Sequence, residues 1–340
     1  MSAIRLPAVV NVTDWVAVNR DQFLPPVCNK MLHTDGQLKL FYVGGPNQRK
    51  DYHIEEGEEL FYMERGDMEL KMLIGNRFVS QPILQGQLFL LPGNLFHSPQ
   101  RAADTIGWVI ERERLASEMD GLRYFLETAD GTPTLRPLFE RYVHMRDLGS
   151  QVAEIIAEYR RSEEFRTGQP KKSASDNADT AAVAYKPELR PLPPVTLADW
   201  LDKHQQELDN AEVKNGSSSL EVFPSQCGYQ FLVEVVGRSD GRQEFVEYNC
   251  ETWLLQLVGE CSVTFYVEKG QTATARRLGE KDSLLVPAGS PLVWCSQPVV
   301  GYSRLARTQV GKATDSLAET ERTSVIPPFC GHPSMEGFCP

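Results

Sequence analysis

The chain has 340 residues, of which 41% are hydrophobic and 24% charged, and its formal net charge at pH 7 is −11. This composition is typical of a soluble globular protein, and the length favours two domains that can each bury a core. The acidic charge argues against a nucleic-acid partner, which would need clustered Lys and Arg. No apolar run reaches the ~18 residues of a membrane helix, and no secretory signal opens the chain. We therefore expect a cytoplasmic protein without a membrane partner.

The seven cysteines are scattered and include no Cys-x-x-Cys pair, so a tetrahedral zinc site is not indicated. Reduced thiols in a reducing compartment are the expected state. Cys330 and Cys339 lie in a Pro- and Gly-rich tail over residues 311–340, to which the sequence assigns no role.

Residues 1–114 are predicted to form a small β-domain behind a short lead-in. A helix is expected to begin near Val12. Apolar runs broken by Gly, Asn and Pro predict strands over 38–43, 59–63, 67–73, 87–91 and 106–110. Many short strands at this spacing are typical of an antiparallel sandwich or barrel.

The spacing of apolar residues changes after the first β-segment. Between residues 115 and 161 the apolar residues recur at helical spacing, so we expect connecting helices on the outside of the barrel. Residues 163–195 are rich in Ser, Asp, Lys and Pro, which predicts a loop or linker. The stretch 115–195 is therefore interpreted as a connecting segment.

The strand pattern returns in residues 196–310, after a helix that Thr196 is expected to cap. Strands are predicted over 229–236, 253–257, 262–267 and 283–287. Positions 58, 60, 66 and 90–92 of the first β-segment match positions 251, 253, 259 and 285–287 of the second. This internal similarity indicates a duplication. The sequence thus predicts a mainly β protein of two barrels joined by helices.

Two histidines and one glutamate in the first β-segment are candidate metal ligands. Residues four apart on an extended chain face the same side, so Arg49 lies beside His53 and Arg101 beside His97. Glu59 follows His53 by six residues. Two imidazoles and one carboxylate can bind a divalent metal such as Fe(II) and leave coordination positions open. The arginines are candidate binding groups for an anionic substrate.

The second β-segment lacks these ligands. Val246, Thr252 and Leu292 stand at the three matching positions, so we expect a metal-free, structural repeat. In the first segment, the glutamates within residues 55–58 are expected to face outward or to support the ligands.

The first β-segment resembles the two-motif signature of the cupin superfamily, whose double-stranded β-helix barrels bind a metal. Glu59 with Gly66 matches the end of the first motif, and residues 86–97 match the second. Where many cupins have His-x-His, this chain has His53-Ile54-Glu55. This departure leaves two histidines and one carboxylate.

Longer stretches resemble the 3-hydroxyanthranilate 3,4-dioxygenase family almost residue for residue, and the resemblance covers most of the chain. These stretches are residues 25–30, 43–62, 90–92, 97–101 and 120–124. The resemblance implies Fe(II) as cofactor, with His53, Glu59 and His97 as its ligands.

The resemblance also implies an aromatic acid with neighbouring hydroxyl and amino groups as substrate, and O₂ as co-substrate. Ring opening would yield 2-amino-3-carboxymuconate semialdehyde, on the route to quinolinate and NAD. Arg101 is expected to bind the substrate carboxylate, Arg49 to lie over the oxygen site, and Glu59 to contact the substrate as well as the metal. Glu111 is expected to orient Arg101 or to accept a proton or hydrogen bond from the hydroxyl and amine.

Two alternatives remain open from the residues. One is another metal-dependent cupin enzyme, such as an isomerase or a thiol dioxygenase. The other is a non-catalytic bicupin that binds a small aromatic acid. Because one chain carries both halves, as the animal and fungal type of the family does, a monomer is expected.

Overall fold

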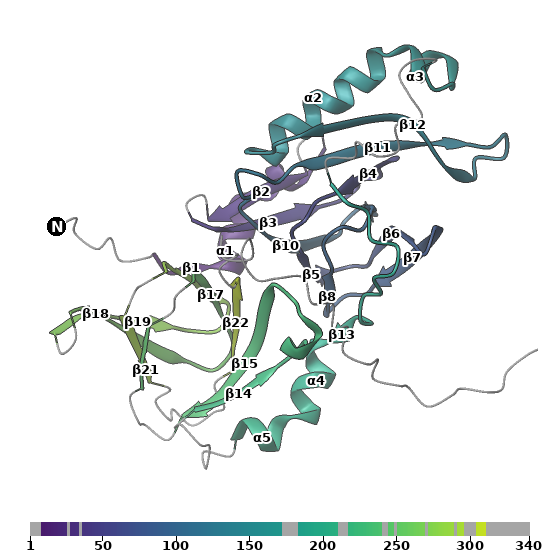
Figure 1. Cartoon of the computed structure of the whole chain (residues 1–340). Helices are drawn as coiled ribbons and strands as arrows, with labels where there is room; N and C mark the ends of the chain where they lie inside the picture. The colour runs from purple at the N-terminus through teal and green to yellow at the C-terminus, as the bar shows by residue number, and fades with distance from the viewer. Residues whose placement is uncertain are drawn as a thin grey trace, which may run out of the picture.

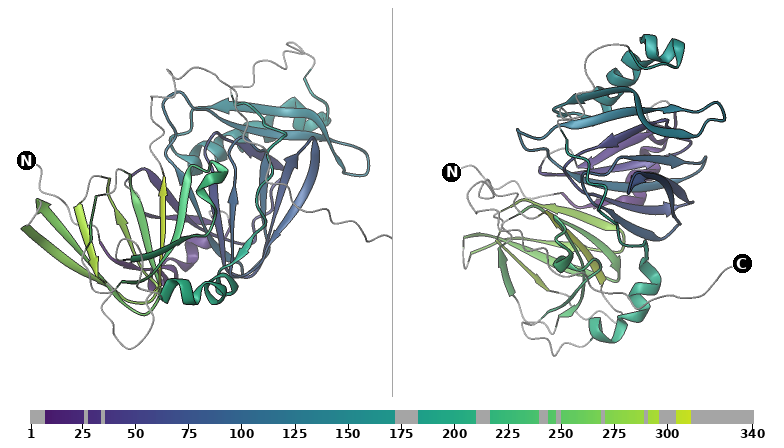
Figure 2. Two further views of the ribbon diagram at one scale, coloured as in Figure 1. Left: turned by 60° about the horizontal axis from the view of Figure 1, so that its bottom comes forward. Right: turned by 45° about the vertical axis from the view of Figure 1, so that its right-hand side comes forward.

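The computed structural model describes residues 8–25, 28–33, 36–171, 183–209, 217–239, 244–247, 250–268, 271–288, 291–295 and 304–310. These residues form a mainly β protein, as the sequence predicts. Figures 1 and 2 show two groups of sheets side by side, one from the first half of the chain and one, in green and yellow, from the second. In the described residues, no helix combines the length and apolarity needed to cross a membrane.

The first half contains two antiparallel six-stranded sheets whose buried side chains face each other. One sheet has the order β13 (Val195–Thr196), β8 (Gln87–Leu91), β5 (Glu59–Arg65), β10 (Ile106–Arg112), β3 (Leu38–Gly44) and β2 (Asn29–His33). The other has the order β12 (Pro133–Val143), β11 (Asp120–Glu127), β4 (Asp51–Ile54), β9 (His97–Arg101), β6 (Met68–Ile74) and β7 (Arg77–Ile83). Phe61, Leu70 and Phe89 belong to the core between the two sheets.

The second half repeats this plan with a six-stranded and a four-stranded sheet. The larger sheet has the order β1 (Val10–Asn11), β20 (Asp282–Val286), β17 (Thr252–Val258), β22 (Arg304–Val310), β15 (Phe231–Ser239) and β14 (Ser217–Glu221). The smaller has the order β16 (Glu244–Glu247), β21 (Pro291–Cys295), β18 (Cys261–Glu268) and β19 (Gln271–Leu278). The helices are α1 (Val12–Val18), α2 (Leu148–Arg161), α3 (Glu163–Thr167), α4 (Leu197–Lys203) and α5 (Gln205–Asp209), with 3₁₀ turns at Arg20–Phe23 and Ser225–Cys227.

Each half receives a short strand from the other part of the chain. Strand β1, at the start of the chain, pairs with β20, and β13, which precedes the second half, pairs with β8. The two pairings are equivalent under the internal repeat. Ser283 lies opposite Val10, and Leu88, which holds the matching repeat position, lies opposite Val195. A helix follows each strand at once, α1 after β1 and α4 after β13. The halves are thus interlocked by a reciprocal exchange of strands.

The strand registers agree with the internal repeat that the sequence indicates. The matching pairs are His53–His97 with Val246–Leu292, and Glu59–Leu91 with Thr252–Val286. Gly66 and Gly259 hold equivalent turn positions with φ of 68° and 72°, a backbone conformation that favours glycine.

The prediction of helices over residues 115–161 is wrong for its first part. Residues 120–127 and 133–143 form strands β11 and β12, whereas residues 148–161 do form a helix, α2. The apparent helical spacing combines the two faces of one strand. Leu122 and Tyr124 pack against α2, which lies over β11 and β12 in Figure 1, while Phe125 packs on the opposite face with Tyr52.

The other element predictions agree with the structure where it can be compared. The strands expected over 38–43, 59–63, 67–73, 87–91 and 106–110 correspond to β3, β5, β6, β8 and β10. Helices begin at Val12 and after Thr196, although the Thr196 hydroxyl makes no capping bond and lies 3.3 Å from Nε2 of Gln87. The predicted linker contains the short helix α3. Residues 172–182 and the tail with Cys330 and Cys339 lie outside the described residues.

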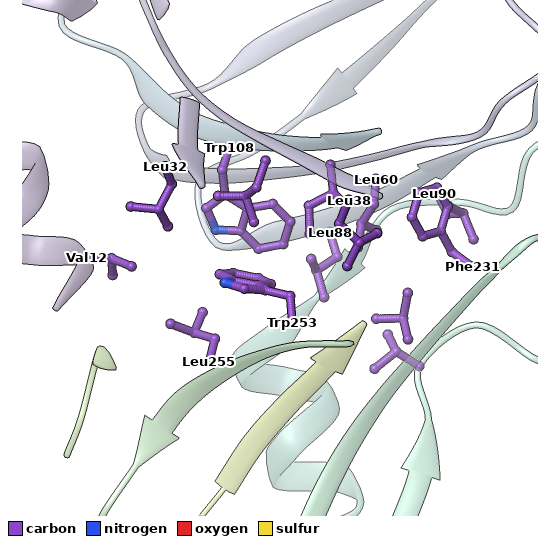
Figure 3. Packing of buried hydrophobic residues seen from close by; sticks show 14 of the residues in the cluster. Val12, Leu32, Leu38, Leu60, Leu88, Leu90, Trp108, Phe231, Trp253 and Leu255 are labelled. Carbon is purple, nitrogen blue, oxygen red and sulfur yellow. The ribbon is translucent and has the colours of Figure 1, made fainter. Parts of the chain in front are cut away.

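Apolar side chains from both halves share one core (Figure 3). Trp108 of β10 and Trp253 of β17 meet edge to face, with ring centroids 5.3 Å apart. Val12, Leu60 and Phe231 belong to the same cluster. Because aromatic pairs of this kind add about 0.5–1.5 kcal/mol to the effect of burial, this contact stabilises the junction of the two halves.

Two buried glutamates at matching repeat positions also cross this junction. Glu58 accepts hydrogen bonds from the backbone N–H groups of Gln230 (2.8 Å) and Phe231 (3.0 Å). Glu251 accepts one from the N–H of Leu38 (2.6 Å). A buried carboxylate without donors would be costly. These hydrogen bonds therefore fix how the two halves pack on each other. Glu58 directly precedes the predicted metal ligand Glu59 in the sequence.

Replacing Trp253 by Ala is expected to lower the free energy of unfolding by about 3–5 kcal/mol, because a side chain that is 1% exposed would leave a cavity at the junction. Urea unfolding measures the change. Val258→Ala, at a 42% exposed position of the same strand, is the control and is expected to change stability by less than about 0.5 kcal/mol. Equal losses for the two variants would contradict the shared core.

Candidate metal centre

Three strands bring the predicted ligands together. His53 on β4 lies directly opposite His97 on β9, and residues that face each other across an antiparallel pair project to the same side. Their ring centroids are 5.2 Å apart. Glu59 is the first residue of β5, in the facing sheet. The three side chains therefore meet between the two sheets, as the sequence predicts.

The donor atoms of the triad are close enough to share one ion. One ligand atom from each of His53, Glu59 and His97 lies within 4.8 Å of the others. Glu59 Oε1 is 2.7 Å from Nε2 of His97 and 3.7 Å from Nδ1 of His53. All three residues are buried, and Glu59 Oε1 has no partner in hydrogen-bonding geometry within the described part of the chain. An orphaned carboxylate oxygen between two imidazoles fits a bound cation.

Hydrogen bonds behind the imidazoles set which nitrogen faces Glu59. Nδ1 of His97 lies 3.1 Å from the carbonyl oxygen of Leu95, which can only accept, so Nε2 carries the free lone pair. Nε2 of His53 lies 2.8 Å from Oδ2 of Asp120, which leaves Nδ1 free. Fixed tautomers of this kind are typical of metal-binding histidines. The residues present fit an Fe(II) ion bound by two imidazoles and one carboxylate.

The electrostatics of the triad favour a cation. Burial lowers the pKa of His53, but the hydrogen bond to Asp120 and the neighbouring carboxylates outweigh this effect and raise it to about 10. Burial raises the pKa of Glu59, yet the two histidines bring it well below its ordinary value. Glu59 is thus ionised at neutral pH, and an incoming metal ion would displace the proton of His53.

A cavity of about 250 Å³ opens onto the triad. Arg49, Arg101 and Glu111 line it together with the three ligands. Its apolar walls come from β3, β5 and helix α2, and include Phe41, Phe61, Val152 and Ile156. The structure therefore brings all six predicted site residues to one cavity.

The two arginines differ in their partners. Arg49 forms an ion pair with Asp51, whose Oδ2 also lies 3.0 Å from Nε of Arg49. Arg101 is 3% exposed, and its side chain forms no hydrogen bond or ion pair with the described residues. Burial lowers the pKa of Arg101 to about 10, so it remains a cation at neutral pH. It is well placed to bind an anionic group in the cavity.

Two charged residues of the site, Arg114 and Asp120, have no assigned role in the sequence interpretation. Glu111 pairs with Arg114 (2.7 Å) and not with Arg101. Arg114 also binds Asp120, which holds His53. Glu55 is expected either to face outward or to support the ligands; it is 3% exposed and its Oε1 lies 2.9 Å from Nη2 of Arg114, so it does not face outward. Burial raises the pKa of Glu55 well above its ordinary value, against the attraction of Arg114. The sequence feature that could have pointed to Arg114 and Asp120 is the dense run of charged residues over 111–120.

The fold and the site together define a mainly β protein with a candidate metal centre between two sheets. Residues 5–160 match the family described as 3-hydroxyanthranilic acid dioxygenase. The chain is 42% identical over 290 residues to the 3-hydroxyanthranilate 3,4-dioxygenase of Mus musculus, a match that covers 84% of this chain and 91% of the mouse protein. Identity to the enzymes of Bos taurus and Homo sapiens is 43% and 40%, with the same coverage of each chain.

Among solved structures, a cupin 2 conserved barrel protein from Leptotrichia buccalis superposes on 92% of this chain with a TM-score of 0.47 and 9% identity. This likeness is too low to bear on function. The family is shown instead by the sequence relatives, which are about 40% identical over most of both chains. The chain belongs to the 3-hydroxyanthranilate 3,4-dioxygenase family.

The purified chain, loaded with Fe(II) under anaerobic conditions, is expected to retain about one metal ion, and His97→Ala is expected to lose it because one of three protein ligands is gone. Inductively coupled plasma mass spectrometry measures the content. His204→Ala is the control, since this histidine is the C-cap of α4 and its Nδ1 bonds the carbonyl of Trp200. Full metal content in His97→Ala would contradict the assigned ligand set.

Proposed function

We propose that this chain is an Fe(II)-dependent, ring-cleaving dioxygenase that converts 3-hydroxyanthranilate and O₂ into 2-amino-3-carboxymuconate semialdehyde, on the route to quinolinate and NAD. The observation that carries the proposal is the meeting of the triad and the unpaired Arg101 in one buried cavity of a chain from this family. His53, Glu59 and His97 would hold the metal. The chemistry that Fe(II) supplies when bound is the transfer of electron density from the ring to O₂.

Arg101 is proposed to bind the carboxylate of the substrate. A planar guanidinium can hold a carboxylate through two parallel hydrogen bonds, and burial strengthens this contact. Arg101 follows His97 by four residues on strand β9. A substrate whose carboxylate binds Arg101 would therefore have its ring held at a fixed distance from the triad. The apolar side chains of Phe41 and Phe61 exclude water on the cavity walls.

Glu111 is proposed to handle the proton of the ring hydroxyl or amine. Burial raises the pKa of Glu111, and the ion pair with Arg114 offsets only part of this rise. A carboxylate whose pKa is raised is a better proton acceptor than an ordinary glutamate. Arg49, held in the cavity wall by Asp51, is proposed to stabilise negative charge that develops on oxygen.

The finer architecture belongs to the same proposal. Residues 1–114 would form the catalytic cupin barrel, to which strands β11 and β12 of the connecting segment 115–195 add, residues 196–310 a metal-free barrel, and residues 311–340 a tail. Val246 and Leu292 face each other in the register of His53 and His97, which supports a repeat that has lost its ligands. A cytoplasmic monomer that contains both barrels is the expected working form.

The test is anaerobic loading with Fe(II), addition of 3-hydroxyanthranilate in air, and spectroscopic detection of the semialdehyde. Wild-type protein is expected to form the product, and Glu59→Ala to form none. A non-catalytic bicupin would bind the acid without forming product. Another metal-dependent cupin enzyme would leave this substrate unchanged.

Arg101→Ala is expected to raise the KM for 3-hydroxyanthranilate about 10- to 100-fold, because a charge-assisted hydrogen-bond pair contributes about 1.5–3 kcal/mol. Steady-state kinetics on metal-loaded protein measure the change. Arg65→Ala, an exposed arginine that bonds only the carbonyl of Asp104 among the described residues, is the control. An unchanged KM in Arg101→Ala would remove the carboxylate role from this residue.

A further inference from the structure

Arg114 lies in the connection between β10 and β11 and is buried among carboxylates. Its side chain is 7% exposed. It reaches Asp120 through Nε (3.1 Å to Oδ1) and Nη2 (2.7 Å to Oδ2), and Glu111 through Nη1 (2.7 Å). Nη2 also lies 2.9 Å from Oε1 of Glu55, although neither Glu55 oxygen is in hydrogen-bonding geometry. A buried guanidinium needs such partners, and here all of them border the metal centre.

The contact between Arg114 and Asp120 connects Arg114 to His53, one of the predicted metal ligands. Asp120 is fully buried, and its Oδ2 is shared between Nη2 of Arg114 and Nε2 of His53 (2.8 Å). Asp120 begins β11, whose next residues pair with β4, where Leu122 lies opposite His53. Arg114 therefore fixes the carboxylate that turns Nδ1 of His53 toward Glu59. A carboxylate behind a metal-binding histidine orients the ring and increases its basicity.

The same guanidinium also holds a group on the other side of the cavity. Glu111 lines the cavity and has Arg114 as its ion-pair partner. One planar side chain thus joins a metal ligand and the residue proposed to handle protons. Lysine carries the same charge but presents a single nitrogen, which cannot reproduce a fork that bonds two carboxylates in fixed directions.

Arg114 also bears on which cluster binds the metal. Besides the triad, two overlapping groups have donor atoms within 4.8 Å of one another: His53, Glu55 and Asp120, and Glu55, Glu59 and Glu111. Both contain residues that Arg114 contacts. A guanidinium placed among these oxygens repels a second cation by its charge. Among the described residues, Arg114 forms no ion pair or hydrogen bond with His53, Glu59 or His97.

We propose that Arg114 is a positioning residue of the metal centre, which acts on His53 through Asp120, sets the place of Glu111, and confines the metal to the triad of His53, Glu59 and His97. This inference rests on the metal centre of the proposed function and is independent of the substrate's identity.

The test is a titration of the metal-free, full-length chain with Co(II), which reports affinity and, through its visible spectrum, coordination. Arg114→Lys and Asp120→Asn are each expected to weaken Co(II) binding about 10- to 100-fold, the range typical when a group that orients a metal-binding histidine is lost. The Co(II) spectrum is expected to change in both variants. Circular dichroism checks that each variant folds, and the nearly isosteric Asp120→Asn tests the inference if Arg114→Lys does not fold.

Arg112→Lys is the matched control. Arg112 is equally buried and pairs with Glu118 (2.5 and 2.7 Å) and with Gln230 (2.7 Å), away from the triad and from Glu111. Its replacement is expected to change Co(II) affinity by less than twofold. Wild-type affinity in Arg114→Lys and Asp120→Asn, or an equal loss in Arg112→Lys, would overturn the inference.

The titration separates this inference from the proposed function. If the wild-type chain binds Co(II) with the predicted dependence on Arg114 but its Fe(II) form leaves 3-hydroxyanthranilate unchanged, the proposed function fails and the positioning role stands. If the wild-type chain forms product while Arg114→Lys keeps its Co(II) affinity, the function stands and the positioning role fails.

Discussion

The antiparallel pairing of β4 with β9 is the constraint on which the site depends. It sets His53 directly opposite His97, and the facing sheet then needs to supply only one carboxylate, from the first residue of β5. Both strands are almost wholly buried, so the imidazoles cannot turn to solvent. The backbone hydrogen bonds between β4 and β9 do not depend on which side chains the strands carry. They thus hold the metal-binding geometry before any metal binds.

The charges around the cavity are divided between support and binding. Arg49 is neutralised by Asp51, and Arg114 by Asp120 and Glu111. Arg101 alone among these three faces the cavity without a partner in the described part of the chain. A buried, unpaired cation costs free energy in the empty site, and an anionic ligand that binds there relieves this cost. The arrangement therefore favours binding of an acid over a neutral molecule of the same shape.

The ligand triad could be predicted from the sequence mainly because the stretches 43–62 and 97–101 that contain it resemble those of a known family. The supporting groups could not. Asp120 stands where the apolar spacing favours a helix, and only the pairing of β11 with β4 brings it to His53. Arg114 belongs to no regular element, so no periodicity predicts the direction of its side chain. Strands β4 and β9 lack apolar–polar alternation because both of their faces are buried.

The exchange of β1 and β13 gives the chain the character of a swapped dimer tied into one polypeptide. Excising the site-bearing half would leave β8 with an unpaired edge, and trimming the first residues would do the same to β20. Such open edges invite aggregation, so each half depends on the other part of the chain to cover one edge of its sheet.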